Sequence, residues 1–333
     1  MKSMNRIDLL KECSDAKTIG ISGHIRPDGD CIGACLGLYL YLKKVFPEKE
    51  ITVYLEKTPE IFDCIKDIDK IEQRYGCTGE CCYFIPPRDV FIALDCSKDR
   101  LGRAEELFDA ARKKINIDHH VTNSAGCGDV NYVIPEASST CELICNLLED
   151  AYLDIDIAKA LYIGIIHDTG VLQYSNTKPE TLQTVAKLIG YGFDFPKLID
   201  ETFYEKTYVQ SQIMGRALLE SVLFMDGKCV VSVVDKKTMD FYGVTPKDLD
   251  GIVNQLRIIK GVECAIFLYE IGTLEYKVSM RSCGVINVSK ISAMFGGGGH
   301  ARAAGCTMNG TSHDVINNIS EQIEKQFTNG EDA

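Results

Sequence analysis

Short apolar segments alternate with longer segments of helical periodicity through the first half of the chain. The pattern predicts strands over 18–22, 51–55, 90–95 and 114–118, and helices over 31–46, 138–150, 157–166 and 180–191. This alternation indicates a doubly wound α/β domain built on a parallel sheet. In such domains ligands bind beyond the carboxyl ends of the strands, so polar residues that close an apolar strand are candidates for chemistry.

The pattern changes in the second half of the chain. A long helical stretch from about residue 195 to 224 predicts a connector, and the segments 228–235, 264–270 and 274–281 predict strands. An amphipathic helix over 312–327 ends a smaller α+β domain. We therefore expect an α/β domain over 1–200, a long helical connector over 201–225 and an α+β domain over 226–333.

Composition and charge restrict the class of function. The chain has 333 residues, which suits two domains, and a net charge of −12. Proteins that bind long nucleic acids carry a basic face, so an anionic substrate should be short and held locally. No apolar run reaches the roughly 18 residues of a membrane-spanning helix, and no secretory signal precedes the first strand. We expect a cytoplasmic protein that binds neither membranes nor long duplexes.

The chain contains 15 cysteines, most of them inside apolar or turn patterns. Most are expected to be small buried residues in a reducing compartment. Cys77, Cys81 and Cys82 form a cluster that could bind a metal, but it lacks the second half of a paired zinc site. We therefore expect these three to lie in a surface loop with unused thiols.

One histidine and two aspartates lie on the segment that joins the first predicted strand to the first helix. His24, Asp28 and Asp30 follow the spacing His-x3-Asp-x-Asp. Imidazole combined with carboxylate suits manganese, iron or zinc better than calcium or magnesium. A Pro-Asp-Gly turn with an aspartate helix cap would explain the same residues equally well.

Three further aspartates close apolar runs. Asp95 ends one predicted strand, Asp118 precedes His119 and His120 at the end of the next, and Asp168 follows a helical run. Taken alone, Asp95 would be a capping residue and Asp168 would belong to a helix end. Two adjacent histidines after an aspartate are rare in ordinary turns, and an aspartate can orient a ligating histidine.

A glycine segment near the C-terminus offers a different chemistry. Residues 296–305 read Gly-Gly-Gly-Gly-His-Ala-Arg-Ala-Ala-Gly. Glycines let backbone N–H groups approach an anion closely, and His300 and Arg302 could add charge-assisted bonds to phosphate. A flexible linker is the alternative, but small residues rather than a polar spacer follow the glycines.

Together these motifs resemble the DHH phosphoesterase superfamily, named for the Asp-His-His triplet, with its DHH-associated C-terminal domain. The ordered motifs extend from Gly23 to Gly305, nearly the whole chain. The chain is most similar to the two-domain nanoRNases and pAp phosphatases, a group that includes phosphodiesterases of cyclic-dinucleotide breakdown products. The larger exonucleases carry extra domains, and the pyrophosphatases have a different second domain, so both fit worse.

The resemblance implies two Mn²⁺ ions per subunit, with Mg²⁺ or Co²⁺ as alternatives. His167 stands where members of the family differ, so the resemblance assigns it no role. The implied ligands are His24 and Asp28 for one ion, Asp30, His119 and Asp168 for the other, and Asp95 as a bridge between them.

The resemblance also implies catalytic and substrate-binding residues. His120 would contact the phosphate, Asp95 and Arg100 would act in catalysis, and Asp118 would support His119. Arg100 lies one residue closer to Asp95 than the corresponding family arginine. The implied substrate-binding residues of the second domain are Arg281, Ser282, Gly298, Gly299, His300 and Arg302.

The implied function is a two-metal phosphoesterase that converts short oligoribonucleotides or dinucleotides to 5′-mononucleotides and 3′-phosphoadenosine 5′-phosphate (pAp) to AMP. A phosphodiesterase of pApA, pGpG or cyclic di-AMP is a second possibility, and a nucleotide-sensing binding protein without catalysis is a third. A homodimer is also implied. The residues leave the choice of substrate open.

Overall fold

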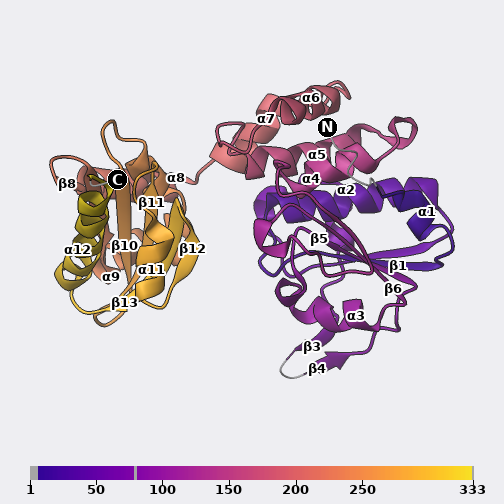
Figure 1. Ribbon diagram of the computed structural model, residues 1–333, viewed down its shortest axis with the longest axis horizontal. Helices are drawn as coiled ribbons and strands as arrows, with labels where there is room; N and C mark the ends of the chain where they lie inside the picture. Colours follow the sequence, from indigo (N-terminus) through magenta and orange to yellow (C-terminus); the bar gives the residue numbers. More distant parts are fainter. Residues whose placement is uncertain (1–6, 79–80, 332–333) are drawn as a thin grey trace. The chain divides into compact units, whose positions relative to one another are not determined.

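The computed structural model describes residues 7–78 and 81–331, apart from the side chains of 77, 78, 81, 300 and 329–331. The chain divides into two compact units, Met1–Glu205 and Lys206–Ala333 (Figure 1). Each unit has its own sheet and its own buried apolar core.

A parallel sheet forms the centre of the first unit, with the strand order β2-β1-β5-β6-β7. The strands are β1 (Thr18–Ser22), β2 (Glu50–Tyr54), β5 (Val90–Leu94), β6 (Lys113–Asp118) and β7 (Val130–Val133). Strand β5 is buried at every position because both faces of the sheet are covered. The four predicted strands are confirmed, whereas the sheet-edge strand β7, which is mostly half-buried, was not predicted.

Helices pack on both faces of this sheet, as the doubly wound prediction requires (Figure 1). Ile21 and Ile92 face a core shared with α2, α4 and α5, while Tyr54 and Phe91 face the opposite core, shared with α3. The helices are α1 (Leu9–Cys13), α2 (Gly29–Val45), α3 (Glu105–Ala110), α4 (Thr140–Leu147), α5 (Ile155–Asp168), α6 (Pro179–Ile189) and α7 (Phe195–Ile199).

Short elements complete the first unit. The 3-10 helices are η1 (Glu60–Phe62), η2 (Ile68–Lys70), η3 (Lys98–Arg100), η4 (Gly102–Ala104), η5 (Val121–Asn123) and η6 (Asp150–Tyr152). Strands β3 (Gly76–Thr78) and β4 (Cys81–Tyr83) form a hairpin in which Cys77 and Cys82 are backbone partners. Cys82 is disulfide-bonded. The expectation of a surface loop is therefore wrong, because these cysteines lie on paired strands, and the expectation of an unused thiol is wrong for Cys82.

The second unit is an α+β domain with a mixed sheet in the order β12-β13-β11-β10-β9-β8. Helices α11 and α12 cover one face, while α8, α9 and α10 cover the other. The strands are β8 (Val222–Phe224), β9 (Cys229–Val234), β10 (Cys264–Gly272), β11 (Glu275–Ser282), β12 (Gly298–His300) and β13 (Ala303–Asn309). The helices are α8 (Tyr208–Leu219), α9 (Lys236–Tyr242), η8 (Pro246–Leu249), α10 (Ile252–Arg257), α11 (Val288–Met294) and α12 (Ser312–Glu331).

The stretch predicted as one long helical connector is divided into separate elements. Helix α7 continues into the π-helix η7 (Asp200–Tyr204), and Thr207 then caps the N-terminus of α8. Ile213 and Ala217 of α8 are buried in the core of the second unit. Because this apolar side of α8 needs cover, residues 206–225 fold as part of the second unit rather than as a free-standing connector.

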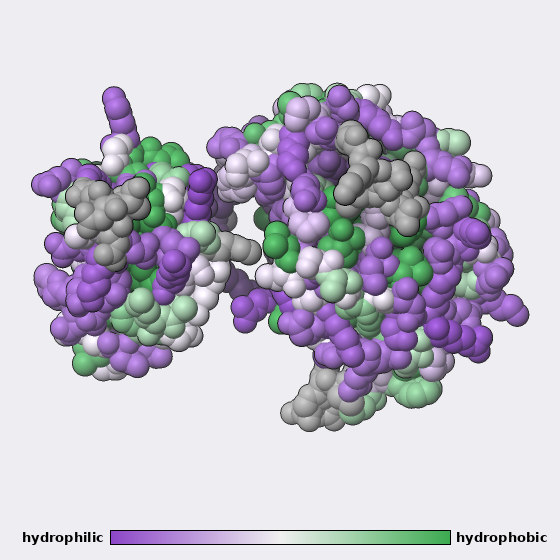
Figure 2. Space-filling view, viewed as in Figure 1, coloured by the Kyte–Doolittle hydropathy of each residue, from purple (hydrophilic) through white to green (hydrophobic). Residues whose placement is uncertain are grey.

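Hydrophilic side chains cover most of each unit in the view of Figure 2, and hydrophobic ones show in small groups. Across residues 7–78 and 81–331, we find no helix with the length and apolarity needed to cross a bilayer.

Helices α2 and α5 approach each other closely because glycines remove side chains where they meet. A Cβ on Gly33 of α2 would lie 2.5 Å from the carbonyl oxygen of Ala160 on α5, and a Cβ on Gly164 of α5 would lie 3.1 Å from Cα of Asp30 on α2. Backbone atoms cannot move aside as a flexible side chain does. The separation of these two helices therefore depends on glycine.

We expect Gly33→Ala to lower the free energy of unfolding by about 1–3 kcal/mol, because the added methyl group overpacks this contact. Gly215→Ala is the matched control, since Gly215 lies inside α8 and a Cβ there would meet nothing within 4 Å. Alanine at that position should stabilise the protein by about 0.5–1 kcal/mol. Denaturant unfolding followed by circular dichroism compares the variants, and a Gly33→Ala protein as stable as the wild type would contradict the packing argument.

Candidate metal centre

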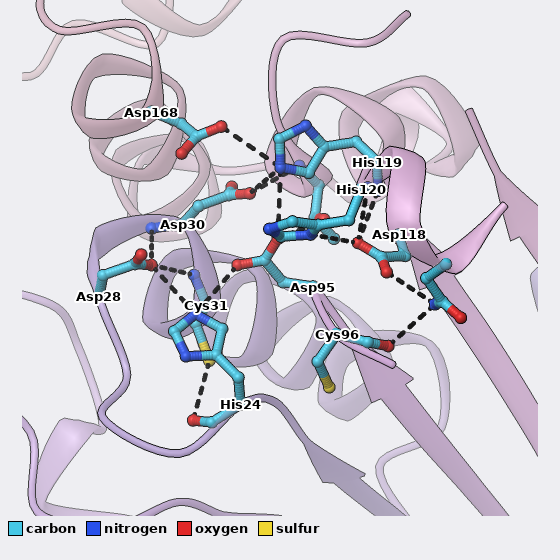
Figure 3. A network of polar contacts seen from close by, with 12 residues as sticks. His24, Asp28, Asp30, Cys31, Asp95, Cys96, Asp118, His119, His120 and Asp168 are labelled. Carbon is cyan, nitrogen blue, oxygen red and sulfur yellow. Dashed lines mark hydrogen bonds and ion pairs between the residues drawn. The ribbon is translucent and has the colours of Figure 1, made fainter. Parts of the chain in front are cut away.

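The sheet topology brings the polar strand ends together. Strands β1 and β5 are parallel neighbours. The strand order reverses here, because β2 lies on the other side of β1 while β6 and β7 continue beyond β5. This makes the gap between β1 and β5 the switch point where α/β domains bind ligands. The loop with His24 follows β1, Asp95 follows β5, and Asp118 ends β6. Asp168 joins them from the C-terminal end of α5. Six side chains predicted as metal ligands thus meet in one place (Figure 3).

The first group contains His24, Asp28 and Asp95. Nε2 of His24 lies 3.5 Å from Oδ1 of Asp28 and 3.4 Å from Oδ2 of Asp95 (Figure 3). Nδ1 of His24 is 2.9 Å from the carbonyl oxygen of Ile25, so Nδ1–H can donate there and leave Nε2 for a ligand. Asp28 also caps α2 by accepting the N–H of Asp30. The helix cap and the site residue are therefore the same side chain.

The second group contains Asp30, His119 and Asp168. Nε2 of His119 lies 3.9 Å from Oδ2 of Asp30 and 3.3 Å from Oδ2 of Asp168. The same nitrogen is 3.5 Å from Oδ1 of Asp95. One oxygen of Asp95 therefore faces His24, and the other faces His119. This is the position that a carboxylate shared between two cations would occupy.

A third group, Asp95, His119 and His120, overlaps the second. Nδ1 of His120 lies 2.8 Å from Oδ1 of Asp118 and 3.7 Å from Oδ1 of Asp95. Asp118 accepts the backbone N–H of His119 at 2.7 Å but contacts the ring of His120. The support expected from Asp118 for His119 is thus limited to the backbone, because the ring of His119 turns toward the second group.

Electrostatic interactions favour charged imidazoles in this centre. Burial lowers the pKa of His24, but the carboxylates of Asp28 and Asp95 outweigh it and raise the pKa to about 12. Burial also lowers the pKa of His119, yet Asp95, Asp30 and Asp168 together raise it to about 10. Without a cation, both rings therefore carry protons near neutral pH.

The carboxyl groups respond to the same neighbours in opposite ways. Burial acts to raise the pKa of Asp95, but the rings of His119 and His24 outweigh it and hold this pKa well below its usual range. Burial raises the pKa of Asp30 well above its ordinary value, and Asp95 and Asp168 add to the rise. Burial likewise raises the pKa of Asp168 to about 7.

This donor set fits divalent cations. Four carboxylates lie together with the imidazoles of His24 and His119, and Asp30 and Asp95 are almost fully buried. Buried carboxylates of this kind are found paired or bound to metals. Mixed imidazole and carboxylate donors suit Mn²⁺, Fe²⁺ or Zn²⁺ better than Mg²⁺ or Ca²⁺. Whether the six residues bind ions stays a prediction, but their geometry is the one that the prediction requires.

His167 lies outside the three groups. Its ring packs edge-on against Phe62 and Phe203, and its Nε2 is 3.1 Å from Oγ1 of Thr202. Burial lowers its pKa to about 4, so the ring is neutral near pH 7. The sequence pattern assigned it no role, and its partners are those of a structural histidine.

Several residues of the centre were not found from the sequence. The backbone N–H groups of Thr140 and Cys141 donate to Asp30, and the amide of Asn123 donates to Oδ2 of Asp118 at 2.7 Å. A signal was present, since Ser-Ser-Thr before an apolar run marks a helix N-terminus. Its position beside Asp30 could not be inferred from it.

Arg100 belongs to none of the three groups. It ends η3 with an exposed side chain, and its carbonyl oxygen accepts the N–H of Ile25 at 2.8 Å. The contact shown is thus structural, because it holds the loop beside His24. A catalytic role for Arg100 stays a prediction.

The substrate-binding residues predicted for the second unit lie on β11 and on the hairpin β12–β13. Arg281 donates from Nε to Oδ1 of Asn254 at 3.1 Å. Ser282 is buried, and its hydroxyl has no hydrogen-bond partner among the described residues. The glycine segment is a hairpin strand rather than a flexible linker. The hairpin includes Gly298, Gly299 and Arg302, and His300 is described only through its backbone.

Two family models match the chain. The DHH family, N-terminal domain, matches residues 18–165, and the DHHA1 domain matches residues 226–329. A Thermus thermophilus protein named bifunctional oligoribonuclease and PAP phosphatase NrnA is 31% identical over 318 residues, which cover 93% of this chain and 90% of that protein. The chain belongs to the DHH family.

Other known proteins match over a similar length. A Bacillus subtilis protein with the same name is 26% identical over 325 residues, covering 96% of this chain and 97% of that protein. The crystal structure of an exopolyphosphatase-related protein from Bacteroides fragilis is 26% identical, with a TM-score of 0.84 and coverage of 95% of this chain and 94% of that one. The likeness in fold therefore extends over nearly the whole chain.

Binding of a divalent cation to the metal-free protein should release protons, because His24 and His119 hold protons near pH 7 and Asp168 is partly protonated there. A metal requires neutral imidazole and ionised carboxylate. The affinity should therefore fall as the pH is lowered, by about tenfold per pH unit for each proton released. Calorimetric titration near pH 7 in two buffers with different heats of ionisation measures the release, and equal heats in both would contradict it.

Proposed function

We propose that this chain is a metal-dependent phosphoesterase that hydrolyses short oligoribonucleotides to 5′-mononucleotides and pAp to AMP. The main support is the meeting of His24, His119 and four aspartates at the switch point of the sheet. Two relatives that match almost the whole chain are named bifunctional oligoribonuclease and PAP phosphatase. We further propose that the enzyme is cytoplasmic, binds two Mn²⁺ ions per subunit and forms a homodimer.

In the proposed mechanism each of the first two groups holds one cation. The first group is His24, Asp28 and Asp95, and the second is Asp30, His119 and Asp168. When bound, divalent cations would polarise the phosphoryl oxygens and lower the pKa of an attacking water. Asp95 would serve both groups, because each of its oxygens faces a different histidine. Removal of Asp95 should therefore affect both positions at once.

His120 is proposed to contact the phosphate. Its Nδ1 is held by Asp118, so Nε2 is left for a phosphoryl oxygen. The hydrogen bond to Asp118 is the main reason that the pKa of His120 is raised, which favours the protonated form that donates. Arg100 would add a positive charge for the same anion.

The second unit is proposed to bind the nucleotide. Arg281, Ser282, Gly298, Gly299, His300 and Arg302 would form this binding site. The chain carries a net charge of −12. A longer nucleic acid would extend past the cationic residues of this binding site and be repelled by the acidic surface.

An activity panel tests the function. With Mn²⁺ present, we expect turnover of a five-nucleotide RNA, pApA and pAp. Loss of a residue that only supports a metal ligand typically costs about 10–100-fold. Because Asp95 is itself a proposed ligand, we expect Asp95→Asn to lower kcat/KM by more than about 100-fold. Asp99→Asn is the control, since Asp99 is exposed on η3 and bonds to Ser97.

The same panel separates the alternatives. A kcat/KM for cyclic di-AMP or pGpG that exceeds the values for RNA and pAp by orders of magnitude would favour the signalling phosphodiesterase. Tight binding of pApA without hydrolysis of any member would favour the nucleotide-sensing protein and reject the enzyme.

Arg302→Gln should raise KM for pApA by about 10-fold or more while kcat changes less, because a charge-assisted hydrogen bond to phosphate is lost. Arg216→Gln is the matched control. Arg216 is an exposed arginine of the same unit that pairs with Glu220 on α8. Initial-rate kinetics on pApA provide both constants, and equal KM values for the two variants would remove Arg302 from the proposed site.

A further inference from the structure

Thr140 connects the two groups of proposed ligands. Its backbone N–H donates to Oδ2 of Asp30 at 2.7 Å, and its hydroxyl donates to Oδ1 of Asp95 at 3.0 Å. The next residue, Cys141, donates its N–H to Oδ1 of Asp30 at 2.9 Å. Thr140 is fully buried. The first turn of α4 therefore holds one carboxylate through the backbone and the other through a single hydroxyl.

The start of α4 is itself fixed in place. Ser139 caps the helix by accepting the N–H of Glu142 at 3.0 Å. The buried carboxylate of Glu142 accepts hydrogen bonds from the N–H and hydroxyl of Ser138, and from the hydroxyl of Thr181 on α6 at 2.8 Å. These bonds restrain the first turn of α4, so the position of the Thr140 hydroxyl is also restrained.

The orientation of the Asp95 carboxylate depends on the Thr140 hydroxyl. Its Oδ1 faces both the hydroxyl of Thr140 and Nε2 of His119, while its Oδ2 faces Nε2 of His24. A carboxylate can rotate about its last torsion. The hydrogen bond from Thr140 to Oδ1 opposes this rotation. It therefore keeps Oδ1 directed to the group with His119 and Oδ2 directed to the group with His24.

We propose that Thr140 is a positioning residue that presets Asp95 to serve both cation positions before any ion binds. The proposal rests on the metal-dependent function proposed above and adds a residue that the sequence motifs did not include. Ligands that are fixed by outer hydrogen bonds lose less freedom on binding a metal, and loss of such a partner typically costs about 10–100-fold in affinity.

Two substitutions separate this role from packing. Thr140→Val keeps the shape and the backbone N–H to Asp30 but removes the hydroxyl. Thr140→Ser keeps the hydroxyl and removes the methyl group. Thr184→Val is the matched control for loss of a buried threonine hydroxyl, since Thr184 lies on α6 and is also buried.

The experiment is calorimetric titration of Mn²⁺ into the metal-depleted full chain. We expect Thr140→Val to weaken Mn²⁺ binding by about 10–100-fold, and we expect Thr140→Ser and Thr184→Val to bind like the wild type. The melting temperature of each metal-free variant is measured in parallel as a control for stability. We expect Thr140→Val to lose more Mn²⁺ affinity than Thr184→Val even where the two variants have similar melting temperatures. If Thr140→Val does not fold, Thr140→Ala removes the same hydroxyl.

The outcomes distinguish this inference from the proposed function. Equal Mn²⁺ affinity of wild type and Thr140→Val would overturn the positioning role while the function stands. Weak binding by Thr140→Ser would assign the effect to packing and would also overturn it. A wild-type chain that binds no divalent cation would reject the metal-dependent function itself.

Discussion

The burial of two carboxylates at the edge of a parallel sheet is the constraint on which the site depends. Asp30 and Asp95 are almost fully withdrawn from water, and an uncompensated buried charge is strongly destabilising. Two compensations are present. Backbone N–H groups at the start of α4 bind Asp30, and the rings of His24 and His119 lie beside Asp95. Much of the local structure serves to bring these donors within reach.

Small residues are part of the same arrangement. A Cβ on Gly164 would lie 3.0 Å from Oδ1 of Asp30 as well as against Cys141. A Cβ on Gly29, between two of the proposed ligands, would lie 2.6 Å from the ring of His167. Glycine is therefore required where α2, α4 and α5 converge. The neutral ring of His167 packs against Gly29, between Asp28 and Asp30, and is not part of the three groups of possible ligands.

The glycine hairpin of the second unit follows a similar principle. A Cβ on Gly297 would lie 2.3 Å from the carbonyl oxygen of Gly305, and a Cβ on Gly299 would lie 2.5 Å from that of Ala303. Gly298 differs from both, because a Cβ there would meet nothing within 4 Å. Two of these glycines thus allow close packing against β13, while the position of a Cβ on Gly298 faces open space.

The sequence by itself determined the α/β class, the main strands and the six residues that meet in the centre. The class and the strands follow from local periodicity. The six residues were singled out by their motifs and by the resemblance to the DHH superfamily, and the rule that strand ends lie at one edge of a parallel sheet explains why Asp95 lies there. The tertiary structure decided which atoms face each other. Thr140 and Asp95 are 45 residues apart, and Cys141 and Asp30 are 111 apart. Contacts over such distances depend on strand order and helix packing, which no local pattern contains.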